Sequence, residues 1–214
     1  DKLFVRNVKT EIEEELIFSD ENVYVPGISL AQRNRDTNEI YLGYSSPKTP
    51  GKMYSYNLQS KERRLIKEVE IPSGHNSEDY IIERVECKSH DNRMIPLTIT
   101  RHKNTRLDGS ANLLLYGYGS YGSSMSPSFS STKLSLINRD IIWVTAHIRG
   151  GMERGMKWWK EGKLLNKKNT FEDYIAAAKY LIEKKYRSKN KIIGMGGSAG
   201  GLLMGAVVNQ APEL

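Results

Sequence analysis

Residues 191–214 read KIIGMGGSAGGLLMGAVVNQAPEL, and their pattern decides the fold of the larger part of the chain. The apolar run KIIGM predicts a strand, and LLMGAVVNQ predicts a helix. Between them lies a G-x-S-x-G pattern, with Gly196 and Gly200 on either side of Ser198. Glycines relieve the crowding of a tight strand-to-helix turn and leave the serine hydroxyl exposed. The stretch predicts a nucleophile elbow at Ser198; the alternative is a Gly-rich turn that only packs or holds a phosphate.

The residue after Ser198 has a predicted role of its own. Ala199 opens the predicted helix, and the first amides of a helix have no intrahelical acceptor. We expect its N–H to point toward the oxyanion that forms when Ser198 attacks a carbonyl.

Four further strand-like runs precede the elbow, which makes KIIGMG the fifth strand. The four are YIIERVECKS (80–89), RMIPLTITRH (93–102), NLLLYGY (112–118) and IIWVTAHI (141–148). Strands separated by a helix favour a mostly parallel α/β sheet. In an α/β-hydrolase the nucleophile follows the fifth strand, and an oxyanion donor comes from the loop after the third, which here is YGYGSYG. Residues 73–214 are therefore predicted to be the first part of an α/β-hydrolase domain that lacks its C-terminal strands and helices.

A helix is predicted over residues 169–186, between the fourth and fifth strands. Thr170 is expected to cap it, with Glu172 and Asp173 in its first turn, where carboxylates favour the helix dipole. Its sheet-facing side is predicted to carry Tyr174, Ile175, Ala178, Leu181 and Ile182.

The first 72 residues have a different pattern. Short β-like runs such as EIYLGYSS, KMYSYNL and RRLIKEVEI are separated by turn residues, with no helical run between them. At 40 to 50 residues per blade, this region corresponds to about a blade and a half of a β-propeller. The chain is thus predicted to have the end of a propeller (1–72) before the α/β domain (73–214).

Composition excludes several other classes. With 214 residues, 38% hydrophobic and 27% charged, the chain resembles an ordinary globular protein, and no apolar run approaches the length of a membrane span. The net charge of +7 is scattered without interleaved aromatic residues, which favours a solvated surface over nucleic-acid binding. A single cysteine, Cys87, has no disulfide or thiolate-metal partner, which suits a cytoplasmic location. We expect neither a cofactor nor a metal, and neither a nucleic acid nor a membrane as partner.

GYGSYG, residues 117–122, also fits the dinucleotide-binding pattern G-x-G-x-x-G. That pattern should open a helix and be followed about 20 residues later by an acid at the end of the next strand. Here SSMSPSFSS follows, and Asp140 precedes its strand, so nucleotide binding is disfavoured.

Four stretches in this order, NLLLYGYGSYG, AHIRGGMERGMKWWKEGK, NKKNTFEDY and MGGSAGGLLMGAVVNQAPEL, resemble the prolyl oligopeptidase family of serine peptidases, within it most closely the oligopeptidase B (protease II) branch. The resemblance implies that Ser198 is the nucleophile and that the Ala199 amide and the Tyr118 hydroxyl are the oxyanion donors. Tyr116 is interpreted as a packing residue, and Arg149, Gly150 and Gly151 as structural.

The resemblance also implies a substrate class: short peptides cut after Lys or Arg. Ser126 and Ser128 stand where acids of that branch bind a second basic residue, which argues against a preference for paired basic residues. The alternatives are prolyl oligopeptidase or acylaminoacyl peptidase specificity.

No histidine or aspartate follows Ser198 in this sequence, whereas the triad of this fold runs Ser, Asp or Glu, then His. The resemblance places those partners, and the acid that reads Lys or Arg, beyond Leu214. His75, His90 and His102 are interpreted as surface residues and His147 as a core residue; a triad of His147 and Asp173 with Ser198 is disfavoured. We expect the chain alone to be inactive, and to be a fragment of a longer polypeptide, a split-gene product that associates with a complementary piece, or a proteolytic piece. The non-enzymatic alternative is a binding or scaffold role.

Overall fold

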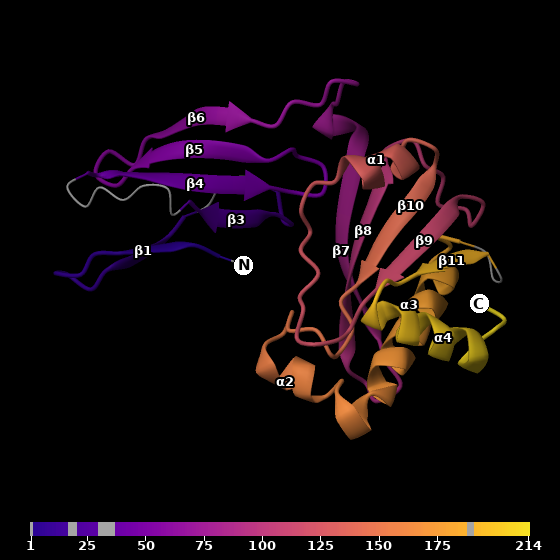
Figure 1. Cartoon of the computed structure of the whole chain (residues 1–214). Coiled ribbons are helices and arrows are strands. Elements are labelled where there is room, and N and C mark those ends of the chain that lie inside the picture. Colours follow the sequence, from indigo (N-terminus) through magenta and orange to yellow (C-terminus); the bar gives the residue numbers. More distant parts are fainter. Residues whose placement is uncertain (1, 17–20, 30–36, 188–190) are drawn as a thin grey trace. The chain divides into compact units, whose positions relative to one another are not determined.

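The computed structural model describes residues 2–16, 21–29, 37–187 and 191–214 (Figure 1). The chain forms two compact units. The first comprises Asp1–Ser77 with Pro127–Ser131, and the second comprises Glu78–Ser126 with Thr132–Leu214. The return of residues 127–131 to the first unit was not among the sequence predictions.

The first unit is built from antiparallel strands. Strands β1 (Phe4–Arg6) and β2 (Glu13–Glu15) pair with each other. A second sheet has the order β3-β4-β5-β6, with the bounds Val25–Ile28, Glu39–Ser45, Lys52–Asn57 and Arg63–Glu68. Each strand of this sheet pairs with the next along the chain, and no helix lies among the residues described before Ser77. The small core of this unit centres on Leu42 and Tyr44 of β4.

A five-stranded sheet forms the centre of the second unit. Its strands are β7 (Tyr80–Lys88), β8 (Met94–His102), β9 (Asn112–Gly117), β10 (Ile141–Ala146) and β11 (Ile192–Met195), in the spatial order β11-β9-β10-β8-β7. β9 runs parallel to β10 and β11, whereas β8 runs antiparallel to β10 and β7. Four strands therefore point in one direction and only β8 opposes them, in agreement with the predicted mostly parallel sheet.

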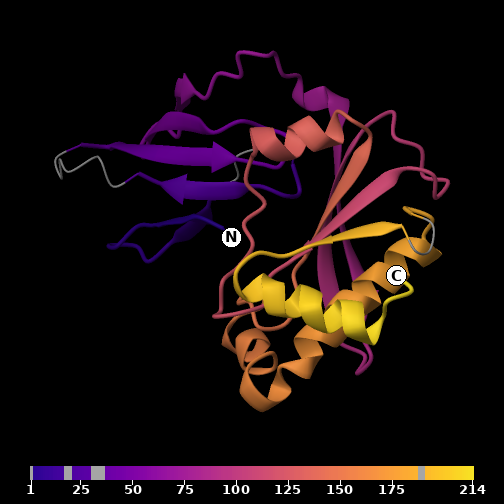
Figure 2. The same ribbon diagram turned by 45° about the vertical axis from the view of Figure 1, so that its right-hand side comes forward.

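The helical segments of the second unit are short except for two. α3 (Lys168–Glu183) and α4 (Ala199–Gln210) pack side by side (Figure 2) and contribute to one core with the central strands. The shorter segments are η1 (Ser77–Asp79), α1 (Ser131–Ile137), α2 (Met156–Lys160) and η2 (Leu164–Asn166). The fully buried side chains of this core include Ile95, Leu97 and Ile99 of β8, Leu113 and Leu115 of β9, Ile142 and Val144 of β10, and Leu181 and Leu203 of the two helices. No helix in the described part of the chain is long and apolar enough to cross a membrane.

The start of α3 differs from the prediction. The helix begins at Lys168, two residues before Thr170. Lys167, at the N-cap position, already has helical backbone angles, and no side chain caps the helix. Thr170 is therefore not the cap; its buried hydroxyl donates to the carbonyls of Arg149 and Gly162, at 2.8 and 3.1 Å. The first turn contains no acid, so the predicted dipole roles of Glu172 and Asp173 are also wrong.

The predicted apolar face of α3 is largely correct. Tyr174, Ile175, Ala178 and Leu181 are buried, and Ile182 is half-buried. The hydroxyl of Tyr174 donates to the carbonyl of Leu115 at 2.6 Å. This bond ties α3 to β9, the strand that leads into the YGYGSYG loop.

Candidate active site

The carboxyl ends of β9 and β11 bring two predicted site residues to one edge of the sheet. The strands are neighbours and parallel, and Met195 is in register with Tyr116. Tyr118 follows the end of β9, and Ser198 follows the end of β11. Two chain segments about 80 residues apart in the sequence are thus placed at the same edge of the sheet.

Ser198 occupies a strained turn between β11 and α4. Its backbone angles are φ 52° and ψ −119°, and its side chain is exposed. A non-glycine residue with positive φ costs on the order of 1–3 kcal/mol and is held in place only by its surroundings. Its hydroxyl does not cap α4, and it has no hydrogen-bond partner within the described ranges. A strained, exposed serine between a strand and a helix is the arrangement of a nucleophile elbow.

The two motif glycines are required by close backbone contacts. A Cβ on Gly196 would lie 2.5 Å from the carbonyl oxygen of Gly200, and a Cβ on Gly200 would lie 3.0 Å from that of Gly117. Gly197 and Gly201, by contrast, have open space around the Cβ position. The G-x-S-x-G spacing therefore lets the elbow fold back on itself and lets α4 approach the end of β9.

The amide of Ala199 is at the first position of α4. The amides of Gly200 and Gly201 bond to the carbonyls of Gly197 and Ser198, at 2.7 and 2.8 Å, which closes the first turn. Ala199 N–H lies at the positive end of a 12-residue helix, where no intrahelical acceptor exists for it. It is thus a backbone donor next to the serine hydroxyl.

Tyr118 is half-buried and packs along the elbow. Its Cδ2 lies 3.7 Å from the position that a Cβ on Gly200 would take. Its hydroxyl has no hydrogen-bond partner among the residues that the structure describes. Tyr116, interpreted as a packing residue, stacks on Trp143 with ring centroids 6.1 Å apart.

The loop that carries Tyr118 rests on the turn at residues 149–151. Gly119 has φ +62°. A Cβ on Gly150 would lie 2.0 Å from the carbonyl oxygen of Gly119. A Cβ on Gly162 would lie 2.2 Å from the amide nitrogen of Gly150. The amide of Gly122 donates to the carbonyl of Gly150 at 2.9 Å. Three chain segments thus meet backbone to backbone beneath the loop, which supports a structural role for Gly150.

Arg149 fixes this turn from inside the protein. Its side chain is 1% exposed and forms ion pairs with Asp173 at 2.6 Å and with Asp91 at 2.5 Å. Burial alone would lower the pKa of the guanidinium, but the hydrogen bonds to the two carboxylates outweigh it and raise the pKa. Ser89 donates to Asp173 at 2.6 Å as well. These contacts support the structural interpretation of Arg149, and sequence reasoning did not predict its partners.

The structure does not support a triad of His147 and Asp173 with Ser198, since Asp173 is paired with Arg149. His147 is 2% exposed and follows β10, two strands from β11, which corresponds to about 10 Å across the sheet. Its Nε2 lies 2.8 Å from both Arg84 Nη1 and Thr98 Oγ1, while its Nδ1 lies 3.6 Å from Glu153 Oε1. His147 is thus a buried residue with polar neighbours, as interpreted from the sequence.

None of the other three histidines belongs to the strands or turns that carry Tyr118 and Ser198. His102 ends the antiparallel strand β8 at the opposite edge of the sheet and is half-buried rather than a surface residue. His90 is exposed in the turn between β7 and β8, which lies at the carboxyl end of β7, four strands away from β11 in the sheet. His75, in the first unit, is half-buried rather than a surface residue, with its Nε2 2.6 Å from the carbonyl oxygen of Lys48.

The competing interpretation of GYGSYG as a nucleotide-binding turn also lacks support. No helix opens from residues 117–122; α1 begins only at Ser131. No cluster of His, Cys, Asp and Glu that could hold a metal ion occurs among the described residues.

Known proteins match this chain over most of its length. The model of the prolyl oligopeptidase family matches residues 127–214. Dipeptidyl aminopeptidase BI of Pseudoxanthomonas mexicana is 42% identical over 98% of the chain, and Protease 2 of Moraxella lacunata is 40% identical over 91%. The structure of oligopeptidase B from Leishmania major superposes with a TM-score of 0.89 and 33% identity over 99% of the chain.

The relatives that match are named as peptidases. The chain belongs to the prolyl oligopeptidase family, as its four sequence stretches predicted. It spans 29%, 28% and 31% of the length of the three relatives named above.

Proposed function

We propose that the protein to which this chain belongs is a serine oligopeptidase that cleaves short peptides after Lys or Arg. The observation that carries the proposal is the strained, exposed Ser198 at the turn between β11 and α4, with Tyr118 at the same edge of the sheet. Family membership and the names of the relatives support a peptidase.

The proposed reaction passes through an acyl-enzyme. Ser198 Oγ attacks the scissile carbonyl carbon and gives its proton to a histidine. The carbonyl oxygen becomes an oxyanion that accepts hydrogen bonds from Ala199 N–H and Tyr118 Oη. The histidine then protonates the departing amine as the C–N bond breaks. Water, deprotonated by the same histidine, attacks the ester carbonyl carbon. The bond from that carbon to Ser198 Oγ then breaks, the histidine returns the proton to Oγ, and the carboxylic acid product leaves.

We propose that the histidine and its aspartate are supplied by sequence beyond Leu214. A serine without a base is a weak nucleophile, so the 214-residue chain alone is expected to be inactive. In the same proposal the second unit is the first part of an α/β-hydrolase domain and the first unit is the end of a β-propeller. The four-stranded antiparallel sheet β3-β4-β5-β6 has the strand number of one blade, and β11 leads directly into the elbow. We also propose a cytoplasmic location, consistent with the lone Cys87.

The specificity at the cut is the finer part of the proposal. Similarity to Protease 2 and to oligopeptidase B supports cleavage after Lys or Arg. The uncharged Ser126 and Ser128 give no attraction for a second basic residue. A substrate panel with Arg, Lys or Pro at the cleaved position separates this proposal from prolyl oligopeptidase specificity, and acylated peptides test acylaminoacyl peptidase specificity.

The experiment uses the full-length protein that contains this sequence. A fluorophosphonate should label Ser198, and Ser198→Ala should lose both labelling and cleavage of Arg- and Lys-linked substrates. A Ser198→Ala protein that still cleaves them would overturn the assignment of the nucleophile. A full-length protein that is neither labelled nor active, yet binds peptides, would instead favour the binding or scaffold role.

A further inference from the structure

The loop after β9 needs anchors outside itself. Gly119, which follows Tyr118 directly, has φ +62°, and a glycine in the unfolded or unanchored chain populates many other conformations. The direction of the Tyr118 side chain depends on the path of this loop. The contacts that fix the Gly119–Ser120 segment therefore bear on where the phenol hydroxyl lies.

Lys167 makes two of these contacts. Its Nζ donates to the carbonyl oxygen of Gly119 at 2.5 Å and lies 2.8 Å from Oγ of Ser120. Lys167 is the residue before α3, and its backbone already has helical angles, so the base of the side chain is fixed by the helix. A lysine that starts on a packed helix thus reaches the residue next to Tyr118.

The charge of Lys167 is not used for an ion pair. No carboxylate in the described ranges pairs with its ammonium group, and the side chain is half-buried. Burial lowers the pKa of Lys167, because it removes part of the hydration of the charged form. Hydrogen bonds from a charged donor are about twice as strong as neutral ones, so the two loop contacts compensate for part of this loss. Among the residues that the structure describes, the hydrogen bonds of the Lys167 ammonium therefore go to the loop at Gly119 and Ser120 and not to a carboxylate.

We propose that Lys167 is a positioning residue for the oxyanion donor Tyr118. Its ammonium holds the Gly119 carbonyl and the Ser120 hydroxyl, and thereby fixes the loop that carries the phenol next to Ser198. The role rests on the proposed function for its catalytic consequence, but the anchoring of the loop does not.

The first experiment compares Lys167→Met with Lys168→Met in the full-length protein. Lys168 is the adjacent lysine, is exposed, and provides the matched control. The concentration of active sites is first determined by titration with a fluorophosphonate, so that a loss of folded protein is not counted as a loss of rate. Per labelled site, Lys167→Met should lower kcat about 10- to 100-fold with little change in KM, because misplacing a catalytic group by about 1 Å can cost about 100-fold. Lys168→Met should stay within twofold of the unchanged protein.

Two further measurements separate positioning from a general structural role. A peptide aldehyde, which forms a tetrahedral adduct with the serine, should bind Lys167→Met more weakly by the same factor as the loss in kcat/KM. Lys167→Arg, which keeps a cationic donor, should recover at least part of the lost kcat. A Lys167→Met protein with kcat per labelled site equal to the control, or with unchanged aldehyde affinity, would overturn the proposal.

The anchoring can be measured even if the proposed peptidase activity proves wrong. Hydrogen–deuterium exchange over residues 117–126 should be faster in Lys167→Met than in Lys168→Met, while exchange in β9 and β10 stays the same. Gly122 is a specific reporter, because its amide bonds to the carbonyl of Gly150. Equal exchange in the two variants would show that Lys167 does not hold the loop, whether or not Ser198 is a nucleophile.

Discussion

Nη2 of Arg149 lies 2.6 Å from Oδ1 of Asp173, and neither side chain is more than 1% exposed. The pair joins the turn beneath the YGYGSYG loop to helix α3. Removing one partner of a buried pair leaves an uncompensated charge and costs about 3–5 kcal/mol.

Asp173→Asn should therefore reduce the free energy of unfolding by about 3 kcal/mol, the lower end of that range, because Arg149 keeps its contact with Asp91. Urea unfolding followed by tryptophan fluorescence measures the change. Glu183→Gln, at an exposed position on the same helix, is the control and should change stability by less than about 0.5 kcal/mol. Equal stability of the two variants would contradict a structural role for the pair.

The elbow glycines provide a second prediction. Gly196→Ala should abolish fluorophosphonate labelling of Ser198 in the full-length protein, because its methyl group would lie 2.5 Å from the carbonyl oxygen of Gly200. Gly201→Ala adds the same methyl group where nothing lies within 4 Å, inside α4. It should keep labelling and raise stability by about 0.5–1 kcal/mol, since alanine favours the helix. Retained labelling in Gly196→Ala would show that the elbow does not need the close approach.

His147 should make the stability of the second unit depend on pH. Burial lowers its pKa below the ordinary 6.5, and the neighbouring Arg84 lowers it further, while Glu153 opposes the shift. Because the unfolded chain binds the proton more tightly than the folded one, the contribution of His147 is fully present above pH 6.5 and is lost as the pH falls below that value.

Unfolding measured between pH 7.5 and 5 tests this pH dependence. The difference in unfolding free energy between the unchanged protein and His147→Asn should shrink as the pH falls. His90→Gln, at an exposed turn position, should follow the unchanged protein throughout. Parallel pH curves for the unchanged protein and His147→Asn would exclude the contribution.

Cys87 gives a prediction about reactivity. The thiol is 1% exposed, and burial raises its pKa to about 12. The thiolate is the reactive form, so iodoacetamide at pH 8 should leave the folded protein unlabelled and label it only in urea. Mass spectrometry reads the outcome without ambiguity, because the chain contains a single cysteine. Rapid labelling without denaturant would mean that β7 opens readily.

The parts of the fold that the sequence predicted are those determined by local patterns. The five strands of the second unit and the elbow at Ser198 follow from short apolar runs and from glycine spacing. The start of α3 could not be predicted from Thr170, because η2 and Lys167 continue the helical path upstream of it. Capping rules describe an isolated helix end, whereas here a preceding turn runs into the helix.

The contacts between distant residues were missed for a different reason. Arg149 and Asp173 are 24 residues apart and meet only because α3 packs against β7 and β8 and comes within hydrogen-bond reach of the turn that follows β10. One signal was available: Asp173 directly precedes the buried Tyr174, and a carboxylate adjoining a predicted apolar face needs a cationic partner. No local pattern indicated that residues 127–131 return to the first unit.

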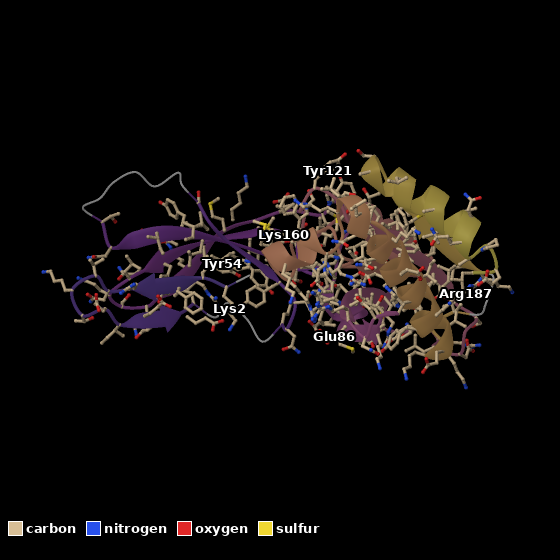
Figure 3. All side chains as sticks on the ribbon, turned by 90° about the horizontal axis from the view of Figure 1, so that it is seen from below. Lys2, Tyr54, Glu86, Tyr121, Lys160 and Arg187 are labelled. Carbon is tan, nitrogen blue, oxygen red and sulfur yellow. The ribbon has the colours of Figure 1, made fainter. Side chains whose placement is uncertain are left out.

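The backbone contacts among Gly119, Gly150 and Gly162 limit how this protein can be re-engineered. A Cβ on Gly150 or Gly162 would meet another main chain, and a Cβ on Gly119 would meet the side chains of Thr170 and Ile148, so single substitutions at these positions would remove the support of the loop. Tyr121, two residues after Gly119, is 81% exposed at the surface of the second unit (Figure 3). Substitutions in this loop that are meant to preserve its path should therefore leave the three glycines unchanged and be placed at Tyr121 or in the serine-rich segment that follows.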